Sequence, residues 1–159
     1  MTSEGERPLN LHGTLNQSMV QSIHDSVGPS PEVIALPDGS SVVFSEDCQH
    51  VLWPNPDRRS EVIPFVFNAT QARAVAAMRD NSRENVLLGE RRLLEIMAVS
   101  TGPDARFAKY FRQSGQLHPA MHRMIRSAGR GQSRVWGLYP PIGGRSWQEI
   151  TRGLSDDSH

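Results

Sequence analysis

The chain has 159 residues, 37% of them hydrophobic, and its 17 Lys and Arg balance its 17 Asp and Glu. Its composition suits an ordered core of roughly 100 residues. It contains no apolar run near the roughly 18 residues of a membrane span, and its polar start lacks the apolar segment of a signal peptide. A single cysteine, Cys48, excludes an internal disulfide. Together these features favour a protein of the reducing cytoplasm, and we expect Cys48 to be a small, buried or half-buried residue.

Residues 1–31 are expected to be mostly disordered, with one amphipathic helix over residues 14–27. Thr14 and Gln17 have capping-box spacing, and apolar residues recur every four positions from Leu15 to Val27. Such a stripe packs on the parent domain or on a second copy of the chain. A mobile segment is an equal alternative, because a lone helix of this length is marginal in water.

Residues 32–67 are predicted to form a β-rich segment that packs on the main domain. Alternating apolar residues and turn signals place its strands at residues 33–36, 41–44, 50–53 and 62–67. The turn Pro37-Asp38-Gly39 joins the first two, since Pro presets φ and Gly accepts a positive φ. Pro64 limits the last strand.

Two helices are predicted next. Asn68 and Gln71 form an N-x-x-Q variant of the capping box, which predicts a helix from Asn68 to about Asn81. A short apolar run, Val86 to Leu88, separates it from a second helix over residues 90–99. The second helix is expected to bury Leu93, Leu94 and Met97 and to expose Arg91, Arg92 and Glu95.

A third helix is predicted over residues 103–113, because Pro103 suits the first helical position. At 100° per residue, Phe107 and Phe111 fall on one side. The opposite side would carry Arg106, Lys109, Arg112 and Gln113. Arg can bind guanine edges or phosphates, Gln can read adenine and Lys favours phosphate. The plain alternative is a solvated charged face, which is what most such faces are.

A basic hairpin is predicted to follow. Residues 121–127 and 134–139 have strand character, and residues 128–133 form a basic tip between them. Arg130 and Arg134 would hold the phosphate backbone or reach the minor groove.

The charges are distributed unevenly along the chain. Residues 1–67 hold 3 Lys and Arg against 9 Asp and Glu, whereas residues 68–139 hold 12 against 5. The two net charges, −6 and +7, indicate a polyanionic partner for the basic segment.

The order of these elements resembles a winged helix-turn-helix domain. The resemblance rests on FNATQARAVAAM, LLGERRLLEIM, DARFAKYFRQ and MHRMIRSAGRGQSRVWGLYP, and it covers residues 68–139. The chain also resembles small uncharacterised bacterial and phage proteins in which a β segment precedes such a domain. The resemblance implies an α+β fold with three helices, in which residues 103–113 are the recognition helix and the hairpin is the wing.

These observations predict a DNA-binding protein, a transcriptional regulator that acts without a catalytic step. The expected contacts are Arg106, Lys109, Arg112, Gln113, Arg130 and Arg134, with Arg91 and Arg92 as weaker phosphate contacts. One rival is a winged-helix module that binds an acidic protein or pairs through residues 15–27 or 147–154, since the same fold also serves protein interaction. A second rival is intramolecular, in which the acidic residues 1–67 cover the basic face and weaken DNA binding.

Other chemistry finds little support in the sequence. His118 and His122 are four apart, but no Cys or acidic residue has suitable local spacing to complete a metal site, so we expect phosphate contacts or plain surface histidines. Nucleophile-elbow, P-loop and dinucleotide-binding motifs are missing, so no enzyme activity and no cofactor are expected. Residues 140–159 are predicted to be a flexible tail. Within it, Ser146 and Glu149 have capping-box spacing, and a short helix there would dock on the domain or on a partner.

Overall fold

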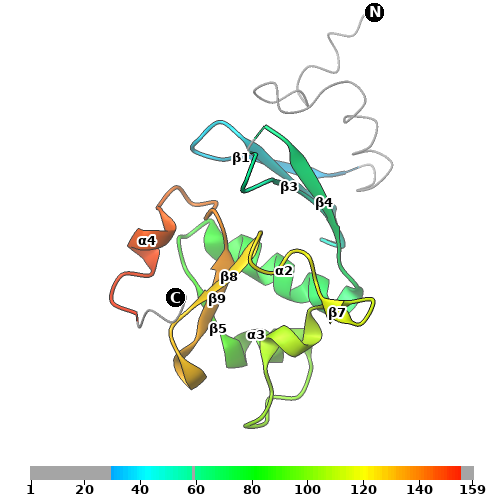
Figure 1. Ribbon diagram of the computed structural model, residues 1–159, viewed down its shortest axis with the longest axis vertical. Coiled ribbons are helices and arrows are strands. Elements are labelled where there is room, and N and C mark those ends of the chain that lie inside the picture. Colours follow the sequence, from blue (N-terminus) through cyan, green and yellow to red (C-terminus); the bar gives the residue numbers. More distant parts are fainter. Residues whose placement is uncertain (1–29, 59, 155–159) are drawn as a thin grey trace, which may run out of the picture. The chain divides into compact units, whose positions relative to one another are not determined.

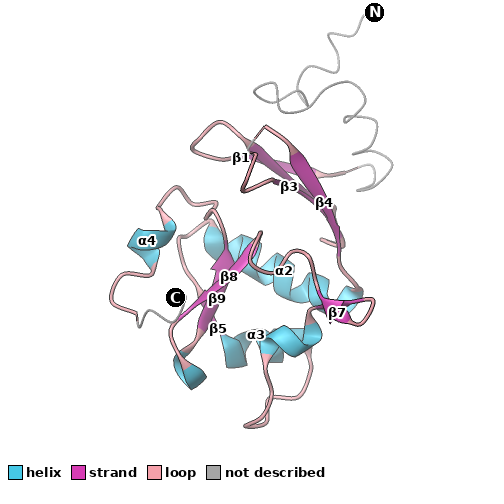
Figure 2. Cartoon of the chain, in the orientation of Figure 1, coloured by secondary structure: helices cyan, strands magenta, loops and turns pink. Residues whose placement is uncertain are grey.

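The computed structural model describes residues 30–58 and 60–154 of the chain (Figures 1 and 2). The predicted helix over residues 14–27 lies outside these residues. The fold is α+β, as predicted, and the chain divides into two compact units, Met1–Phe67 and Asn68–His159. Among the described residues, no helix is long and apolar enough to cross a bilayer.

The first unit contains a four-stranded antiparallel meander, and all four predicted strands are confirmed. Its strands follow the chain order: β1 (Glu32–Ala35), β2 (Ser41–Phe44), β3 (His50–Pro54) and β4 (Val62–Val66). The turn between β1 and β2 forms as expected, because Gly39 adopts a φ of 93° and Asp38 Oδ1 accepts a hydrogen bond from the Ser40 amide at 2.9 Å. Pro64 is tolerated because β4 is an edge strand, with β3 as its neighbour.

Two aromatic residues lie at the centre of this sheet. Phe44 and Trp53 are fully buried and meet edge to face, with ring centroids 6.2 Å apart. Cys48 is also buried, as expected, in the turn between β2 and β3. In the same turn, hydrogen bonds from the Gln49 amide and the Ser45 hydroxyl lower the pKa of Asp47.

The second unit combines short helices with a three-stranded antiparallel sheet. Its first elements are α2 (Ala69–Ser82), β5 (Leu88–Gly89), α3 (Glu90–Met97) and the 3₁₀ helix η3 (Phe107–Tyr110). They are followed by β6 (Arg112–Gln113), β7 (Gln116–Leu117), β8 (Ile125–Ala128), the 3₁₀ helix η4 (Gly131–Ser133), β9 (Val135–Leu138) and α4 (Trp147–Ile150). The strand order of the sheet is β5–β9–β8, and α2 packs against α3 and β9.

Both predicted helices at the start of this unit are confirmed. The side chain of Asn68 accepts from the Gln71 amide at 2.8 Å, and Gln71 Oε1 accepts from the Asn68 amide at 3.0 Å, so the capping box is complete. Helix α3 buries Leu93, Leu94 and Met97, as its spacing predicts. It ends at Ala98, whose φ of 60° lies in the left-handed region.

The segment after β9, assigned to a flexible tail from the sequence, is packed on this unit as far as α4. The Ile142 amide donates to Ser82 Oγ at 2.8 Å, and Ile142 is buried. Gly143 lies so close to the end of α2 that a Cβ atom there would be 2.6 Å from the Ser82 carbonyl oxygen. Trp147 meets Tyr139 edge to face, and the predicted capping box of Ser146 and Glu149 is present. The short helix thus packs on its own domain rather than forming a frayed tail, and docking on a partner stays a prediction.

Candidate nucleic-acid interface

The predicted third helix over residues 103–113 is wrong. Arg106 is extended, with φ −133° and ψ 133°, and only Phe107–Tyr110 form a single turn of 3₁₀ helix. The Phe111 amide donates to the Ala108 carbonyl rather than continuing an α-helical ladder, and Arg112 pairs with Leu117 across a hairpin. Arg106, Lys109, Arg112 and Gln113 therefore do not share one helix face.

Contacts with distant residues explain why the α-helix does not form. Glu90 Oε2 accepts a hydrogen bond from the Phe107 amide at 2.6 Å, which fixes the start of η3 against α3. At the other end, Gln71 Nε2 donates to the carbonyl oxygens of Tyr110 and Arg112, at 2.8 and 3.1 Å. These bonds satisfy backbone N–H and C=O groups without a helix, so an α-helix is not needed to pair them.

Gln71 offers a direct test of this anchoring. We expect Gln71→Glu to lower the free energy of unfolding by about 1–3 kcal/mol, because a buried carboxylate would face two carbonyl oxygens in place of a donating amide. The acceptor for the Asn68 amide is retained, so the loss reports the two carbonyl contacts. Denaturant unfolding at pH 7 and pH 4 measures it, and the penalty should be smaller at pH 4, where the neutral acid can donate. An equal penalty at both pH values would contradict this explanation.

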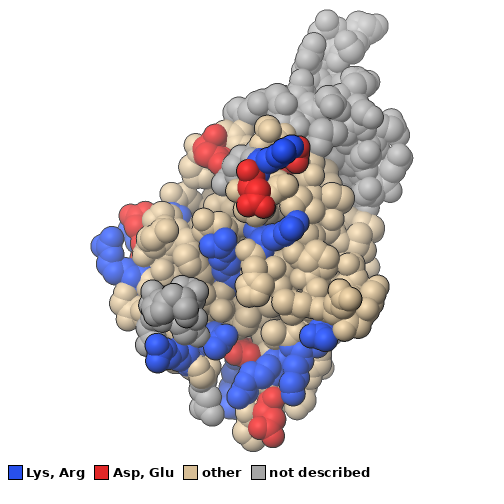
Figure 3. All heavy atoms as spheres, viewed as in Figure 1, with Lys and Arg blue, Asp and Glu red and all other residues tan. Residues whose placement is uncertain are grey.

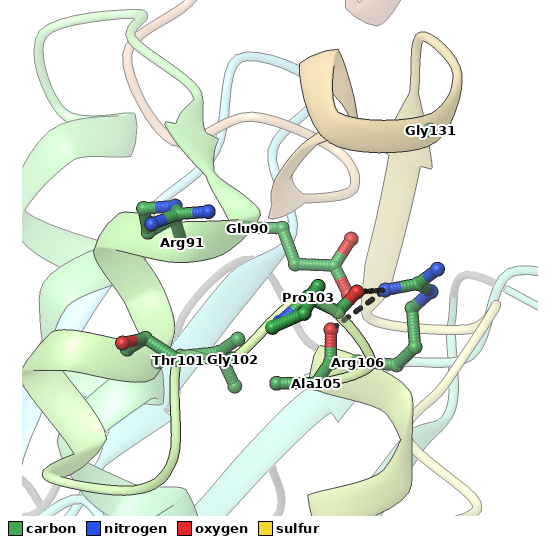
Figure 4. A pocket seen from close by; sticks show the side chains of 9 residues that line it. Glu90, Arg91, Thr101, Gly102, Pro103, Ala105, Arg106 and Gly131 are labelled. Atoms are coloured by element: carbon green, nitrogen blue, oxygen red, sulfur yellow. Dashed lines mark hydrogen bonds between the residues drawn. The ribbon is translucent and has the colours of Figure 1, made fainter.

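Three of the predicted arginines converge on one site from three separate segments. Arg106 and Arg134 line a hollow of about 300 Å³ together with Glu90, Ala108, Gly131 and Trp136. Arg91 lines an adjoining recess that shares Glu90, Arg106 and Gly131 (Figure 4). We call these two depressions together the arginine cleft, defined by Arg91, Arg106 and Arg134.

Glu90 is the acidic residue at the centre of the arginine cleft, and it is not among the contacts predicted from the sequence. It is 8% exposed, and Figure 4 shows it between Arg91 and Arg106. One carboxylate oxygen of Glu90 accepts a hydrogen bond from the Phe107 amide. The backbone amide of Glu90 donates a hydrogen bond to the Arg134 carbonyl at 3.1 Å. Glu90 thus joins the start of α3 to η3 and to the end of η4, and three arginines against one carboxylate leave the cleft positive.

Trp136 lines the hollow, and within the described part of the chain its buried indole nitrogen is an unpaired donor. Its side chain is buried, and its indole Nε1 has no hydrogen-bond partner among the described residues. A buried donor of this kind usually has a protein or water acceptor. Nothing in the local sequence around Trp136 predicts that it lines the hollow, because the hollow is assembled from four separate elements.

The remaining predicted contacts lie outside the arginine cleft. Lys109, Arg112, Gln113 and Arg130 are exposed, and Arg112 Nη2 donates to the Gly115 carbonyl at 3.1 Å. Arg92 forms an ion pair with Glu95 at 3.5 Å, and both side chains are at least half exposed, so the pair contributes little stability. The structure therefore gathers Arg91, Arg106 and Arg134 and leaves the other five on the surrounding surface.

Much of the positive charge on this surface is not paired with a carboxylate. Within the described part of the chain, Arg91, Arg106, Lys109, Arg112 and Arg130 form no ion pair with a carboxylate. Arg106 instead donates to the carbonyl oxygens of Pro103 and Ala105, which carry no net charge. Figure 3 shows Lys and Arg spread over the second unit, where they outnumber the acidic side chains on the visible face.

The histidines differ from expectation in part. His122 is exposed, as predicted, but His118 is buried, and its Nδ1 accepts a hydrogen bond from the Ala120 amide at 3.0 Å. Among the described residues, no group of three or more His, Cys, Asp or Glu is arranged to hold a metal ion.

No protein-family model matches this sequence, and searches of curated proteins and of solved structures gave no match.

Proposed function

We propose that the unit Asn68–His159 binds double-stranded DNA by contacting its phosphates through the arginine cleft and the cationic residues around it. The observation that carries the proposal is the convergence of Arg91, Arg106 and Arg134 on one hollowed surface. Guanidinium groups bind phosphate oxygens in a bidentate geometry, and such contacts supply most of the affinity for duplex DNA. The biological role that we attach to this binding is transcriptional regulation.

A winged-helix arrangement remains part of this proposal. Its support is the order α2, β5, α3, followed by the β8–β9 hairpin, and the pairing of β5 with the second strand of that hairpin. In this proposed arrangement, η3 and the β6–β7 hairpin occupy the place of a recognition helix. The proposed mode of binding therefore relies on loops and hairpins, with the phosphate backbone as the main contact.

A titration of the full chain against a fluorescent random duplex, across salt concentrations, tests this function. If about four phosphates are neutralised, log K should fall with log salt at a slope of about −3.6. Fluorescence anisotropy gives both the affinity and the slope. No binding at low salt, or an affinity independent of salt, would exclude the proposal and favour the rival module that binds an acidic protein.

A further inference from the structure

The hairpin formed by β6 and β7 is exposed along its whole length. All six residues from Arg112 to Leu117 are exposed, and Figure 1 shows β7 at the margin of the unit. Ser114 and Gly115 form its loop, with φ values of 55° and 80°. Two consecutive positive φ values are typical of the primed turns that connect tight hairpins.

The base of this hairpin is firmly held. Phe111 and His118, immediately before and after it, are buried, and the His118 amide donates to the Phe111 carbonyl at 2.8 Å. Their rings also meet edge to face, with centroids 6.3 Å apart. The bonds from Gln71 to the carbonyls of Tyr110 and Arg112 add a tie to the start of α2. A fixed base and a fully exposed tip suit a contact element rather than a packing element.

The tip presents two matched amides on one face. Gln113 pairs directly with Gln116, and residues opposite each other in an antiparallel pair share a face of the ribbon. Arg112 and Leu117 form the next pair, on the opposite face. The guanidinium of Arg112 donates to the Gly115 carbonyl, which braces the loop.

This chemistry fits the edges of base pairs. The major groove of B-DNA admits a two-stranded β-ribbon, and a glutamine amide can bind adenine through its N6 and N7 positions. Exposed cations, Arg106 and Lys109, precede the hairpin in the chain and favour an anionic partner. A protein partner is less suited to the tip, because Leu117, 40% exposed, is its one large apolar side chain.

We propose that the β6–β7 hairpin enters the major groove of duplex DNA, where Gln113 and Gln116 select sites that contain adenine. The inference rests on the proposed function, since the arginine cleft supplies the affinity that does not depend on sequence. The hairpin takes the base-reading role that was predicted for a helix over residues 103–113.

Selection from a random duplex library with the full chain, followed by sequencing of the bound pool, tests the inference. Anisotropy then compares the enriched duplex with a scrambled one for the wild type and for Gln113→Ala/Gln116→Ala. The enriched site should contain A·T pairs. The double variant should lose about tenfold or more of its preference for that site, while its affinity for the scrambled duplex stays within about twofold, because phosphate contacts carry non-specific binding.

Gln148→Ala is the matched control, because Gln148 is an exposed glutamine of α4, outside the hairpin. It should keep both the preference and the affinity. Two results would overturn the inference and leave the proposed function standing: equal binding of all duplexes by the wild type, or an unchanged preference in the double variant. Absence of any duplex binding by the wild type at low salt would overturn both.

Discussion

Replacing Phe107 with alanine is expected to lower the free energy of unfolding of the second unit by about 3–5 kcal/mol. Phe107 is fully buried, and its ring lies 4.6 Å from that of Phe111 and 4.8 Å from that of Trp136, measured between centroids. Truncation leaves a cavity beneath η3 that these neighbours cannot fill without moving. Denaturant unfolding followed by tryptophan fluorescence measures the change, since Trp136 lies against the altered ring.

Tyr110→Ala is the matched control in the same 3₁₀ helix. Tyr110 is only partly buried, so its truncation should cost clearly less than that of Phe107. The two units can unfold in separate transitions, and the loss should then be confined to one of them. A loss below about 1 kcal/mol for Phe107→Ala would contradict the placement of this ring in the core.

Replacing Arg106 and Arg134 together with alanine is expected to halve the salt dependence of DNA binding. Each phosphate contact contributes about −0.9 to the slope of log K against log salt, so the slope should change from about −3.6 to about −1.8. With equal binding of the two proteins at 1 M salt, the same relation gives an affinity loss of about 60-fold at 0.1 M salt. Anisotropy titrations at several salt concentrations give both quantities. The physical reason is that both side chains line one hollow, so a single phosphate path would meet both.

Two controls separate charge from folding in this experiment. Arg145→Ala removes an exposed charge outside the arginine cleft, and it should leave the slope nearly unchanged. Arg106→Lys/Arg134→Lys keeps both charges and should retain most of the slope while losing bidentate geometry. If the double alanine variant keeps the wild-type slope and a wild-type melting curve, the arginine cleft is not the phosphate-binding surface.

Local patterns predicted the parts of the fold that depend on neighbours in sequence. The four strands of the first unit follow from alternation and turn residues, and α2 follows from the capping box of Asn68 and Gln71. The prediction of a third helix was wrong because the spacing of Phe107 and Phe111 does not distinguish an α-helix from a 3₁₀ turn. Here a 3₁₀ turn brings both rings into the core. The Ser114-Gly115 dipeptide is a turn signal that would have favoured the hairpin. The ties from Gln71 span about 40 positions, 39 to Tyr110 and 41 to Arg112, and no local pattern contains them.

The types of residue in the candidate site could be predicted from the sequence, but the position of the site in the fold could not. Its arginines could be chosen from the sequence because they lie in a basic segment. Their convergence around Glu90 could not, because Arg91, Arg106 and Arg134 come from α3, the start of η3 and the end of η4. Gln116 was overlooked for the same reason, since its pairing with Gln113 exists only once the hairpin forms.

The division of the chain after Phe67 has an electrophoretic consequence. Met1–Phe67 carries 3 Lys and Arg against 9 Asp and Glu, whereas Asn68–His159 carries 14 against 8. The intact chain, with a pI near 7.0, should barely move in a native gel at neutral pH. Fragments cut between Phe67 and Asn68 should migrate toward opposite electrodes, so a single cleavage would convert one nearly stationary band into two that separate in opposite directions.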